Sequence, residues 1–279
     1  MKIIIGINTY HADSSACIIV NGKLIAAIEE ERINRKKHYS GYPIESIKEC
    51  LRIADKKDSE ITDIAFNTKP SSNLLPKGIF FLKNFSFKKV LLSESFKNKI
   101  NVKGLLLNKF TLNKNVKFHY IEHHLAHIAS AFYPSGFNDA VGLSIDGSGD
   151  FVTLAISECK NNRIKIIKKT NFPNSLGIFY HAMTQFLGFK NYGDEYKVMG
   201  LAAYGKPKYF DKIKDNLFIK NKKSIFELNL NYFNHHKNNF KYIAKDSLYI
   251  DEIFNSNLNK LFSSEFKSII NKDQFNKDF

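Results

Sequence analysis

The segment from Lys2 to Glu31, KIIIGINTYHADSSACIIVNGKLIAAIEEE, decides the fold. Three apolar runs rich in β-branched residues, at 2–8, 14–20 and 23–31, predict three strands. A polar turn, TYHAD, separates the first two runs, and Asn21-Gly22 is a strong signal for a two-residue hairpin between the second and third. The segment therefore predicts the order strand, turn, strand, turn, strand.

A helix and a fourth strand follow this opening. Apolar residues repeat at helical spacing directly after Pro43, which suits the first turn of a helix. The run ITDIAFN, residues 61–67, then reads as another strand. The first part of the chain thus predicts three strands, a helix and a strand.

The same plan recurs later in the chain. A shift of 138 residues lays Asn8 on Asp146 and aligns three further strand runs, which begin at DAVGLSID and are separated by the turns GSGD and CKNN. The helical stretch SLGIFYHAMTQFLGF follows them. We expect an α/β fold of two related lobes, residues 1–138 and 139–279, which face a common cleft.

Two regions depart from this plan. Residues 70–115 are basic and irregular, and we interpret them as a helical insert in the first lobe. Beyond Pro207 the pattern loosens into sequence rich in Lys, Asn and Phe, and the final NKDQFNKDF shows neither a helix stop nor a strand. We therefore expect the second lobe to be incomplete.

The composition limits the classes of protein that fit. The net charge of +15 comes from lysines interleaved with asparagines, a general bias without a nucleic-acid-binding module, so we expect no nucleic-acid partner. Apolar runs are too short for a membrane span, the first residues lack the features of a signal peptide, and three distant cysteines fit no disulfide framework. We expect a cytoplasmic protein with no membrane partner.

The stretch IEHHLAH, residues 121–127, concentrates three of the nine histidines. On a helix, His123 and His127 share a face, whereas His124 points about 100° away. This spacing lets two imidazoles hold one metal ion, and Asp146, at the end of an apolar strand, can supply a carboxylate. Such a set suits Fe(II), Mn(II) or Zn(II). The alternative is that the histidines are hydrogen-bonded core or capping residues.

The turn TYHADSS is the second candidate site. His11 and Asp13 can both project into the cleft, where a histidine can act as acid, base or anion clamp near neutral pH, and Ser14 offers a hydroxyl to phosphate. The alternative is a polar turn that only caps a hairpin.

Further positions suit an anion. Arg32, Lys37 and His38 follow the end of the third predicted strand, although a solvated run of charges is the usual outcome. Lys197 lies in GDEYKVMGLAAYG, which resembles a glycine-bounded loop entering a helix, and it is either a surface residue or a phosphate contact. We also assign Gly147 and Gly149, in the predicted turn GSGD, to phosphate or substrate binding.

Four blocks together resemble the N-terminal part of the NodU/CmcH-type carbamoyltransferases. They are GINTYHADSSACIIVNGKLIAAIEEERINRKKHYSGYP, EHHLAHIASAFYPSGF, SIDGSGD, and SLGIFYHAMTQFLGF followed by GDEYKVMGLAAYGKP, and they span residues 1–207 in order. The resemblance implies a fold of the actin, sugar-kinase and Hsp70 type, akin to the TsaD-like subunit that modifies tRNA.

The resemblance also implies an activity. The family moves a carbamoyl group from carbamoyl phosphate to a hydroxyl through a carbamoyl-adenylate made with ATP. Its metal ligands correspond to His123, His127 and Asp146, and the family has a further aspartate ligand downstream. The resemblance implies that this site holds Fe(II) or another divalent metal ion. The family's turn histidine, important for transfer, corresponds to His11. The acceptor is expected to be a small molecule or a sugar.

The chain departs from the family in length. Family members are about twice as long, and the downstream aspartate, the rest of the second lobe and the C-terminal YrdC-like domain have no counterpart here. We therefore expect activity to need a C-terminal half or a YrdC-like partner chain. The alternative function is a non-catalytic fragment or subunit that binds ATP or carbamoyl-adenylate. A sugar or acetate kinase is disfavoured because kinases of this fold do not need the HxxxH pair.

Overall fold

The computed structural model describes residues 1–84, 102–221, 224–237, 243–244, 248–249 and 251–263, and divides the chain into two units. The first unit comprises Met1–Gly136 with Ala244–Leu248, and the second comprises Phe137–Ile243 with Tyr249–Phe279. Each unit has its own buried apolar core, so each is described by itself.

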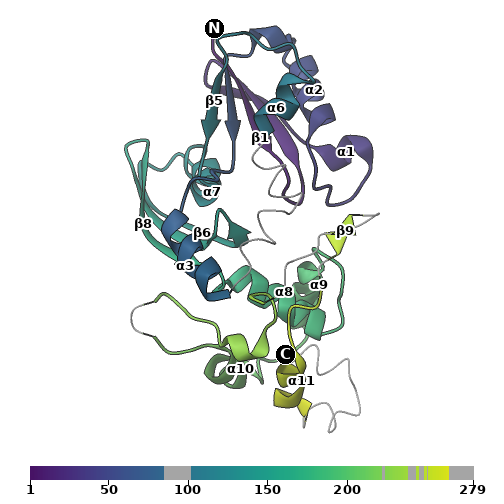
Figure 1. Cartoon of the computed structure of the whole chain (residues 1–279), viewed down its shortest axis with the longest axis vertical. Coiled ribbons are helices and arrows are strands. Elements are labelled where there is room, and N and C mark those ends of the chain that lie inside the picture. Colours follow the sequence, from purple (N-terminus) through teal and green to yellow (C-terminus); the bar gives the residue numbers. More distant parts are fainter. Residues whose placement is uncertain (85–101, 222–223, 238–242, 245–247, 250, 264–279) are drawn as a thin grey trace. The chain divides into compact units, whose positions relative to one another are not determined.

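The first unit contains a five-stranded mixed sheet with helices (Figure 1). Its elements are β1 (Ile3–Asn8), β2 (Ser15–Val20), β3 (Lys23–Glu29), α1 (Glu30–Asn34), α2 (Ile44–Ile53), η1 (Asp58–Glu60), β4 (Asp63–Phe66), α3 (Leu74–Asn84), α6 (Val102–Leu107), β5 (Lys117–Tyr120) and α7 (His123–Phe132).

The strand order in this sheet is β3-β2-β1-β4-β5. β1 pairs antiparallel with β2 and parallel with β4, and β4 pairs parallel with β5. This is the sheet expected of an actin, sugar-kinase or Hsp70-type lobe, so the predicted fold class is confirmed. Because β1 lies at the centre, its carboxyl end at Asn8 carries the TYHAD turn to the edge of the sheet where ligands bind in α/β folds.

Burial of β-branched residues on one face of β1 builds the first core. Ile3, Ile5 and Ile7 alternate with less buried residues and are at most 3% exposed. Helix α2 covers this core with Ile47 and Leu51. The predicted helix after Pro43 and the predicted fourth strand are thus both present.

The third strand is shorter than predicted. It ends at Glu29, and helix α1 begins at Glu30. The carboxylate of Glu30 is buried, and it accepts hydrogen bonds from the backbone N–H of Glu45 and from both the N–H and the hydroxyl of Ser46. Free N–H groups in the first turn of a helix are stabilised by an acidic partner. The Glu30 carboxylate therefore holds this part of the chain against the first turn of α2, which explains why β3 ends at Glu29.

The second unit begins with a three-stranded antiparallel sheet in the order β6-β7-β8. Its elements are β6 (Asp139–Gly149), β7 (Val152–Lys160), β8 (Arg163–Asn171), α8 (Leu176–Phe186), α9 (Glu195–Ala202), α10 (Phe210–Leu217), η2 (Leu230–Tyr232) and α11 (Ser256–Leu261). Two short strands, β9 (Ile243–Ala244) and β10 (Leu248–Tyr249), pair with each other. The order of three strands and a helix therefore repeats that of the first unit.

Residues 147–149 belong to a strand and not to the predicted glycine-rich turn. β6 continues to Gly149 with an irregular register after Ile145, and the reversal falls at Asp150 and Phe151, both with positive φ. The described part of the predicted insert, residues 70–115, contains α3 and α6. Residues 85–101 and the tail 271–279 lie outside the described residues. In the described part of the chain, no helix has both the length and the apolar character needed to cross a membrane.

Candidate functional site

The histidine pair of α7 lies in the first unit, at the start of the helix. The Nε2 atoms of His123 and His127 are 2.9 Å apart, and His123 is only 5% exposed. The Nδ1 of His123 lies 3.3 Å from the carbonyl oxygen of Asn67, at the end of β4. A hydrogen bond from Nδ1–H to a carbonyl places the lone pair of the ring on Nε2, which is the usual arrangement of a metal-binding histidine. The pair therefore fits a divalent cation.

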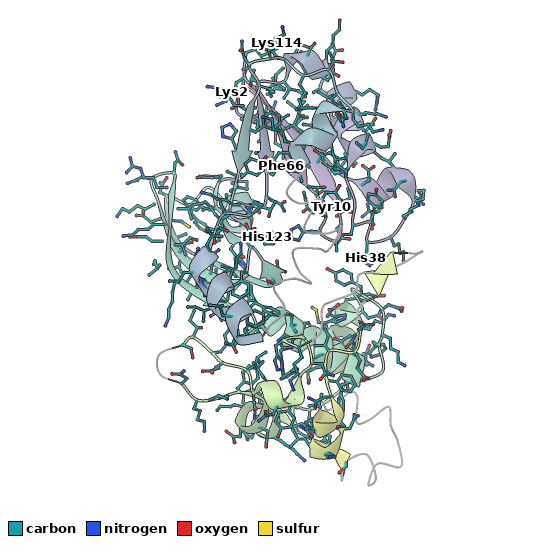
Figure 2. The ribbon with its side chains drawn as sticks, in the orientation of Figure 1. Lys2, Tyr10, His38, Phe66, Lys114 and His123 are labelled. Carbon is teal, nitrogen blue, oxygen red and sulfur yellow. The ribbon has the colours of Figure 1, made fainter. Side chains whose placement is uncertain are left out.

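His11 lies beside this pair. Its ring stacks on that of His123, with centroids 4.9 Å apart and an angle of 29° between the planes. Figure 2 labels His123 and also Tyr10, the neighbour of His11 in the sequence. The first unit thus brings together the predicted transfer histidine and the predicted metal-binding pair, which are more than a hundred residues apart in the chain.

Local hydrogen bonds hold the turn that carries His11. The side-chain amide of Asn8 donates to the carbonyl of Asp13 at 3.0 Å, and the backbone N–H of Tyr10 donates to the carbonyl of Gly41. Ser14 is fully buried, and its hydroxyl lies 2.8 Å from the Gly41 carbonyl, to which it donates. The Ser14 hydroxyl is therefore engaged in anchoring the turn, and its phosphate contact stays a prediction.

Asp13 and His38 form a pair. The Nδ1 of His38 lies 2.9 Å from Oδ1 of Asp13, and the backbone N–H of His38 donates to the carboxylate of Glu31 at 2.8 Å. Both members of the pair have positive φ, a conformation that the surrounding hydrogen bonds must hold. His38 can be followed in Figure 2. This contact gives Asp13 a partner that orients its carboxylate.

The other cations of this segment are exposed. Arg32 lies 3.4 Å from Glu29 with 71% of its side chain accessible, and Lys37 is also exposed. The exposed ion pair of Arg32 contributes little to stability. Arg32 and the exposed Lys37 are therefore both able to move towards an anion. Their role in phosphate binding stays a prediction.

Asp146 belongs to the second unit, where it lies near the end of β6. Its Oδ1 accepts a hydrogen bond from the N–H of Gly147, and the hydroxyl of Ser175, the N-cap of α8, donates to the carbonyl oxygens of both residues. Gly177 in the first turn of α8 packs against the same backbone, and Gly149 is buried one residue before the reversal. The start of α8 therefore fixes the segment that carries Asp146. Its membership of the metal site stays a prediction.

Lys197 forms an ion pair. Its Nζ lies 2.7 Å from Oδ1 of the buried Asp194, and the hydrogen bond that it donates to Asp194 raises the pKa of Lys197. The lysine is therefore charged and partly exposed, as a phosphate contact requires. It is also paired with a carboxylate, as a structural surface residue would be. Its role as a phosphate contact therefore stays a prediction.

Three polar residues escaped the sequence analysis. His181 is buried on α8, and its Nδ1 lies 2.7 Å from the carboxylate of Glu195. Burial by itself raises the pKa of Glu195, but the hydrogen bond from His181, a backbone hydrogen bond and the charge of His181 together outweigh burial and leave that pKa below its usual range. Asn67, which supports His123, is the third. Its position as the last residue of a predicted strand was a usable signal, whereas nothing in the sequence links residues 181 and 195.

The fold and the site define the class of protein. The first unit has the sheet of an actin, sugar-kinase or Hsp70-type lobe, with a histidine turn at the end of its central strand and a HxxxH pair beside it. Residues 3–261 match the family model described as carbamoyltransferase N-terminus. The chain therefore belongs to the carbamoyltransferase N-terminus family.

Individual relatives agree with this assignment. The chain is 36% identical over 248 residues to the uncharacterized protein sll1178 of Synechocystis sp., an alignment that covers 84% of this chain and 40% of that protein. It is 34% identical over 206 residues to the nodulation protein NolNO of Sinorhizobium fredii, covering 72% and 29%. The chain thus spans well under half the length of these relatives.

Among solved structures, component A of the (R)-2-hydroxyglutaryl-CoA dehydratase of Acidaminococcus fermentans is similar to this chain. The TM-score is 0.42 at 13% identity, covering 74% of this chain and 60% of that one. The family assignment rests on the sequence matches.

Proposed function

We propose that the chain forms the carbamoyl-transfer portion of an O-carbamoyltransferase. In this proposal, water cleaves carbamoyl phosphate to carbamate and phosphate, and the carbamate attacks the α-phosphorus of ATP to give a carbamoyl-adenylate and pyrophosphate. The carbamoyl group then passes to a hydroxyl of a small molecule or sugar. The observation that carries the proposal is the stack of His11 on His123, whose Nε2 faces that of His127. A base for the acceptor and a pair of cation ligands are thereby adjacent, as carbamoyl transfer to a hydroxyl requires.

His123, His127 and, from the second unit, Asp146 would hold the divalent ion, with Fe(II) as the first candidate. Such an ion would supply Lewis-acid polarisation of a carbamoyl or phosphate oxygen. The Asn67 carbonyl would keep the ring of His123 in the orientation and tautomer that binding needs. The cation site is thus supported on one side by the hydrogen bond that His123 donates to the backbone carbonyl of Asn67.

His11 would act on the acceptor. It takes the proton of the acceptor hydroxyl as the oxygen forms a bond to the carbamoyl carbon. The bond from that carbon to the adenylate oxygen breaks, and AMP leaves with the bonding electrons. Asp13, held by His38, would orient the acceptor, and Arg32, Lys37 and Lys197 would balance phosphate charge.

The second candidate is a binding subunit without activity of its own. It rests on the same histidine pair, which fits a cation whether or not His11 has a catalytic role. In this case the histidine pair binds the ion and the adenylate, and a partner supplies the remaining groups. Both candidates share the cation site and differ in the need for His11.

Metal analysis tests the shared part. The purified chain should bind about one Fe(II) or Mn(II) per molecule, and His123→Ala, His127→Ala or Asp146→Ala should each remove most of it. His124→Ala and the exposed His119→Ala serve as controls, with circular dichroism to verify folding. Equal loss in all variants, or no loss in any, contradicts the ligand assignment.

Carbamoyl transfer tests the catalytic part. The chain is combined with the remaining portion of a full-length relative, and pyrophosphate release and product carbamoylation are measured separately. His11→Ala should lower carbamoylation about a hundredfold or more, the usual contribution of a general base, and leave pyrophosphate release intact. Unchanged carbamoylation would favour the binding-subunit function.

A further inference from the structure

A cavity of about 420 Å³ lies in the first unit, beside helices α1 and α2, which pack on each other (Figure 1). Its lining comes from α1, the loop after α1, the start of α2 and the turn after α6. Small-molecule sites in proteins have volumes of this order. Neither His11 nor the histidine pair of α7 belongs to this lining, so the cavity is separate from the site described above.

The sheet places the cavity at the edge where α/β folds bind ligands. Strands β1 and β3 are both antiparallel to β2, so their carboxyl ends lie at the same edge. Asn8 and Glu29 end these strands and are both register partners of Ser15. Glu30, the first residue of α1, lines the cavity directly after β3. The cavity therefore begins at the edge that also carries the TYHAD turn.

The floor of the cavity consists of its two buried lining residues, Glu30 and Tyr42. Glu30 is 4% exposed, and its Oε2 accepts two hydrogen bonds of 2.7 Å from Ser46. Its Oε1 accepts one of 3.2 Å from the N–H of Glu45. A carboxylate has about four acceptor positions, so Oε1 keeps the capacity to accept a further donor. The floor therefore suits a ligand with hydroxyl groups.

Aromatic rings form the wall above this floor. The hydroxyl of Tyr42 donates to the carbonyl of Val102 at 3.2 Å, which fixes its ring. The ring of Tyr39 fills the space that Gly41 leaves open, since a Cβ at position 41 would lie 2.5 Å from its Cζ and 2.8 Å from its Cε1. Burial, and after it the charge of Glu30, raises the pKa of Tyr39, so its hydroxyl stays a donor at neutral pH. The wall thus offers apolar ring surface and one hydroxyl.

The rim consists of three exposed lysines, Lys36, Lys48 and Lys109. Lys48 lies 2.8 Å from the carboxylate of Glu45. Within the described part of the chain, the ammonium groups of Lys36 and Lys109 have no acidic partner. The rim therefore carries three cations against one carboxylate. Lysines of this kind are common ligands of phosphate.

Floor and rim select different parts of one ligand. A bare anion would suit the rim, but towards the floor it would meet the negative charge of Glu30, and like charges repel. A neutral sugar would suit the floor and leave the rim cations unused. A nucleobase offers few donors to the carboxylates and the amide in the lining. A hydroxylated ring that carries a phosphate group satisfies floor, wall and rim together.

We propose that this cavity binds a sugar that carries a phosphate group. The sugar hydroxyls donate to the Glu30 carboxylate and accept from the side-chain amide of Asn34, and the ring lies against Tyr39. The phosphate lies among the rim lysines. This binding holds whether or not the chain is catalytic.

The loop that builds the wall also supports the TYHAD turn. The N–H of Ser14 donates to the carbonyl of Tyr39 at 2.9 Å, and the N–H of Tyr10 donates to that of Gly41 at 3.1 Å. The rings of Tyr10 and Tyr42 are also in contact, with centroids 6.3 Å apart. The proposed site is therefore built on the same backbone segment as the turn that carries His11.

Calorimetry on the full chain tests the class of ligand. The probes are the 6-phosphates of glucose, mannose and N-acetylglucosamine, compared with the free sugars, inorganic phosphate and AMP. At least one sugar phosphate should bind tenfold or more tightly than its free sugar and than inorganic phosphate, about what a charge-assisted contact adds. Inorganic phosphate that binds equally well shows an anion site only, and AMP that binds more tightly shows a nucleotide site. Either result, or no binding of any sugar phosphate, overturns the proposal.

Paired lysine variants test the rim. Lys36→Gln combined with Lys109→Gln should weaken binding of the sugar phosphate about tenfold or more. Lys23→Gln combined with Lys117→Gln removes the same charge from exposed positions of the first unit outside the lining, and should change the affinity less than about threefold. Equal weakening by both pairs shows a general charge effect and contradicts the site.

A glycine variant tests the wall. Gly41→Ala should displace the Tyr39 ring and weaken binding about tenfold or more, because the added Cβ overlaps that ring. Gly78→Ala is the control, since a Cβ there meets no atom within 4 Å, and it should bind as the unmodified chain does. Circular dichroism verifies that both variants fold. Unchanged binding by a folded Gly41→Ala chain contradicts the position of the sugar ring.

Discussion

Replacement of Gly177 by alanine should loosen the segment that carries Asp146. A Cβ at position 177 would lie 2.6 Å from the backbone nitrogen of Gly147, and 2.7 and 2.8 Å from the carbonyl carbon and oxygen of Asp146. All three are backbone atoms, which cannot turn aside as the end of a side chain can. Helix α8 would have to withdraw by about 0.6–0.8 Å to restore an ordinary contact of 3.4 Å.

The change in the free energy of unfolding caused by Gly177→Ala is the sum of opposing contributions. Overpacking at a tight backbone contact costs about 1–3 kcal/mol. The same shift lengthens the hydrogen bonds from the Ser175 hydroxyl to Asp146 and Gly147, which adds about 1 kcal/mol. Alanine recovers up to about 1 kcal/mol through its higher helix propensity. The net free energy of unfolding should fall by about 1–3 kcal/mol.

Thermal and urea unfolding followed by circular dichroism measure this change. For a chain of this size the Tm should fall by roughly 2–4 °C per kcal/mol. Gly200→Ala is the matched control, because Gly200 lies inside α9 and a Cβ added there would meet no atom within 4 Å, so the Tm of this variant should rise slightly. A Gly177→Ala protein as stable as the unmodified chain, or a Gly200→Ala protein that is equally destabilised, would refute the packing argument.

Three further predictions concern pH and partners. Burial lowers the pKa of His235 to about 4, so between pH 6.5 and 4 the unfolded state binds a proton that the folded state does not. The free energy of unfolding should therefore fall by about 3 kcal/mol over this pH range. Urea titrations of His235→Gln should no longer show this pH dependence. Hydrogen bonds from His119 and Thr62 lower the pKa of Asp63 in the folded state. The stability that this carboxylate contributes is therefore present above its pKa in the unfolded state and is lost as the pH falls through its pKa in the folded state. Asp63→Asn should flatten the acid side of a plot of Tm against pH. Fluorescence anisotropy at physiological salt should detect no sub-micromolar binding of DNA or RNA, and tight binding would show that the basic charge has a nucleic-acid role.

The sequence by itself determined that three strands followed by a helix succeed one another along the chain in both units. Alternation of apolar residues in β1 and the Asn21-Gly22 turn are local signals, and local signals decide where a strand begins and reverses. The spacing of His123 and His127 likewise predicted a shared helix face, because helical geometry alone sets it. The family could be recognised from the sequence because its characteristic motifs are likewise short local stretches.

Only the tertiary structure decided which distant residues meet. The stack of His11 on His123, the support of His123 by Asn67 and the pairing of His181 with Glu195 depend on how strands and helices pack, which no local spacing encodes. It also showed that Ser14 is engaged in anchoring its turn and that Lys36 and Lys109, far apart in the sequence, line one cavity. Local patterns specify each element, but which elements face one another depends on how the assembled chain buries its apolar surface.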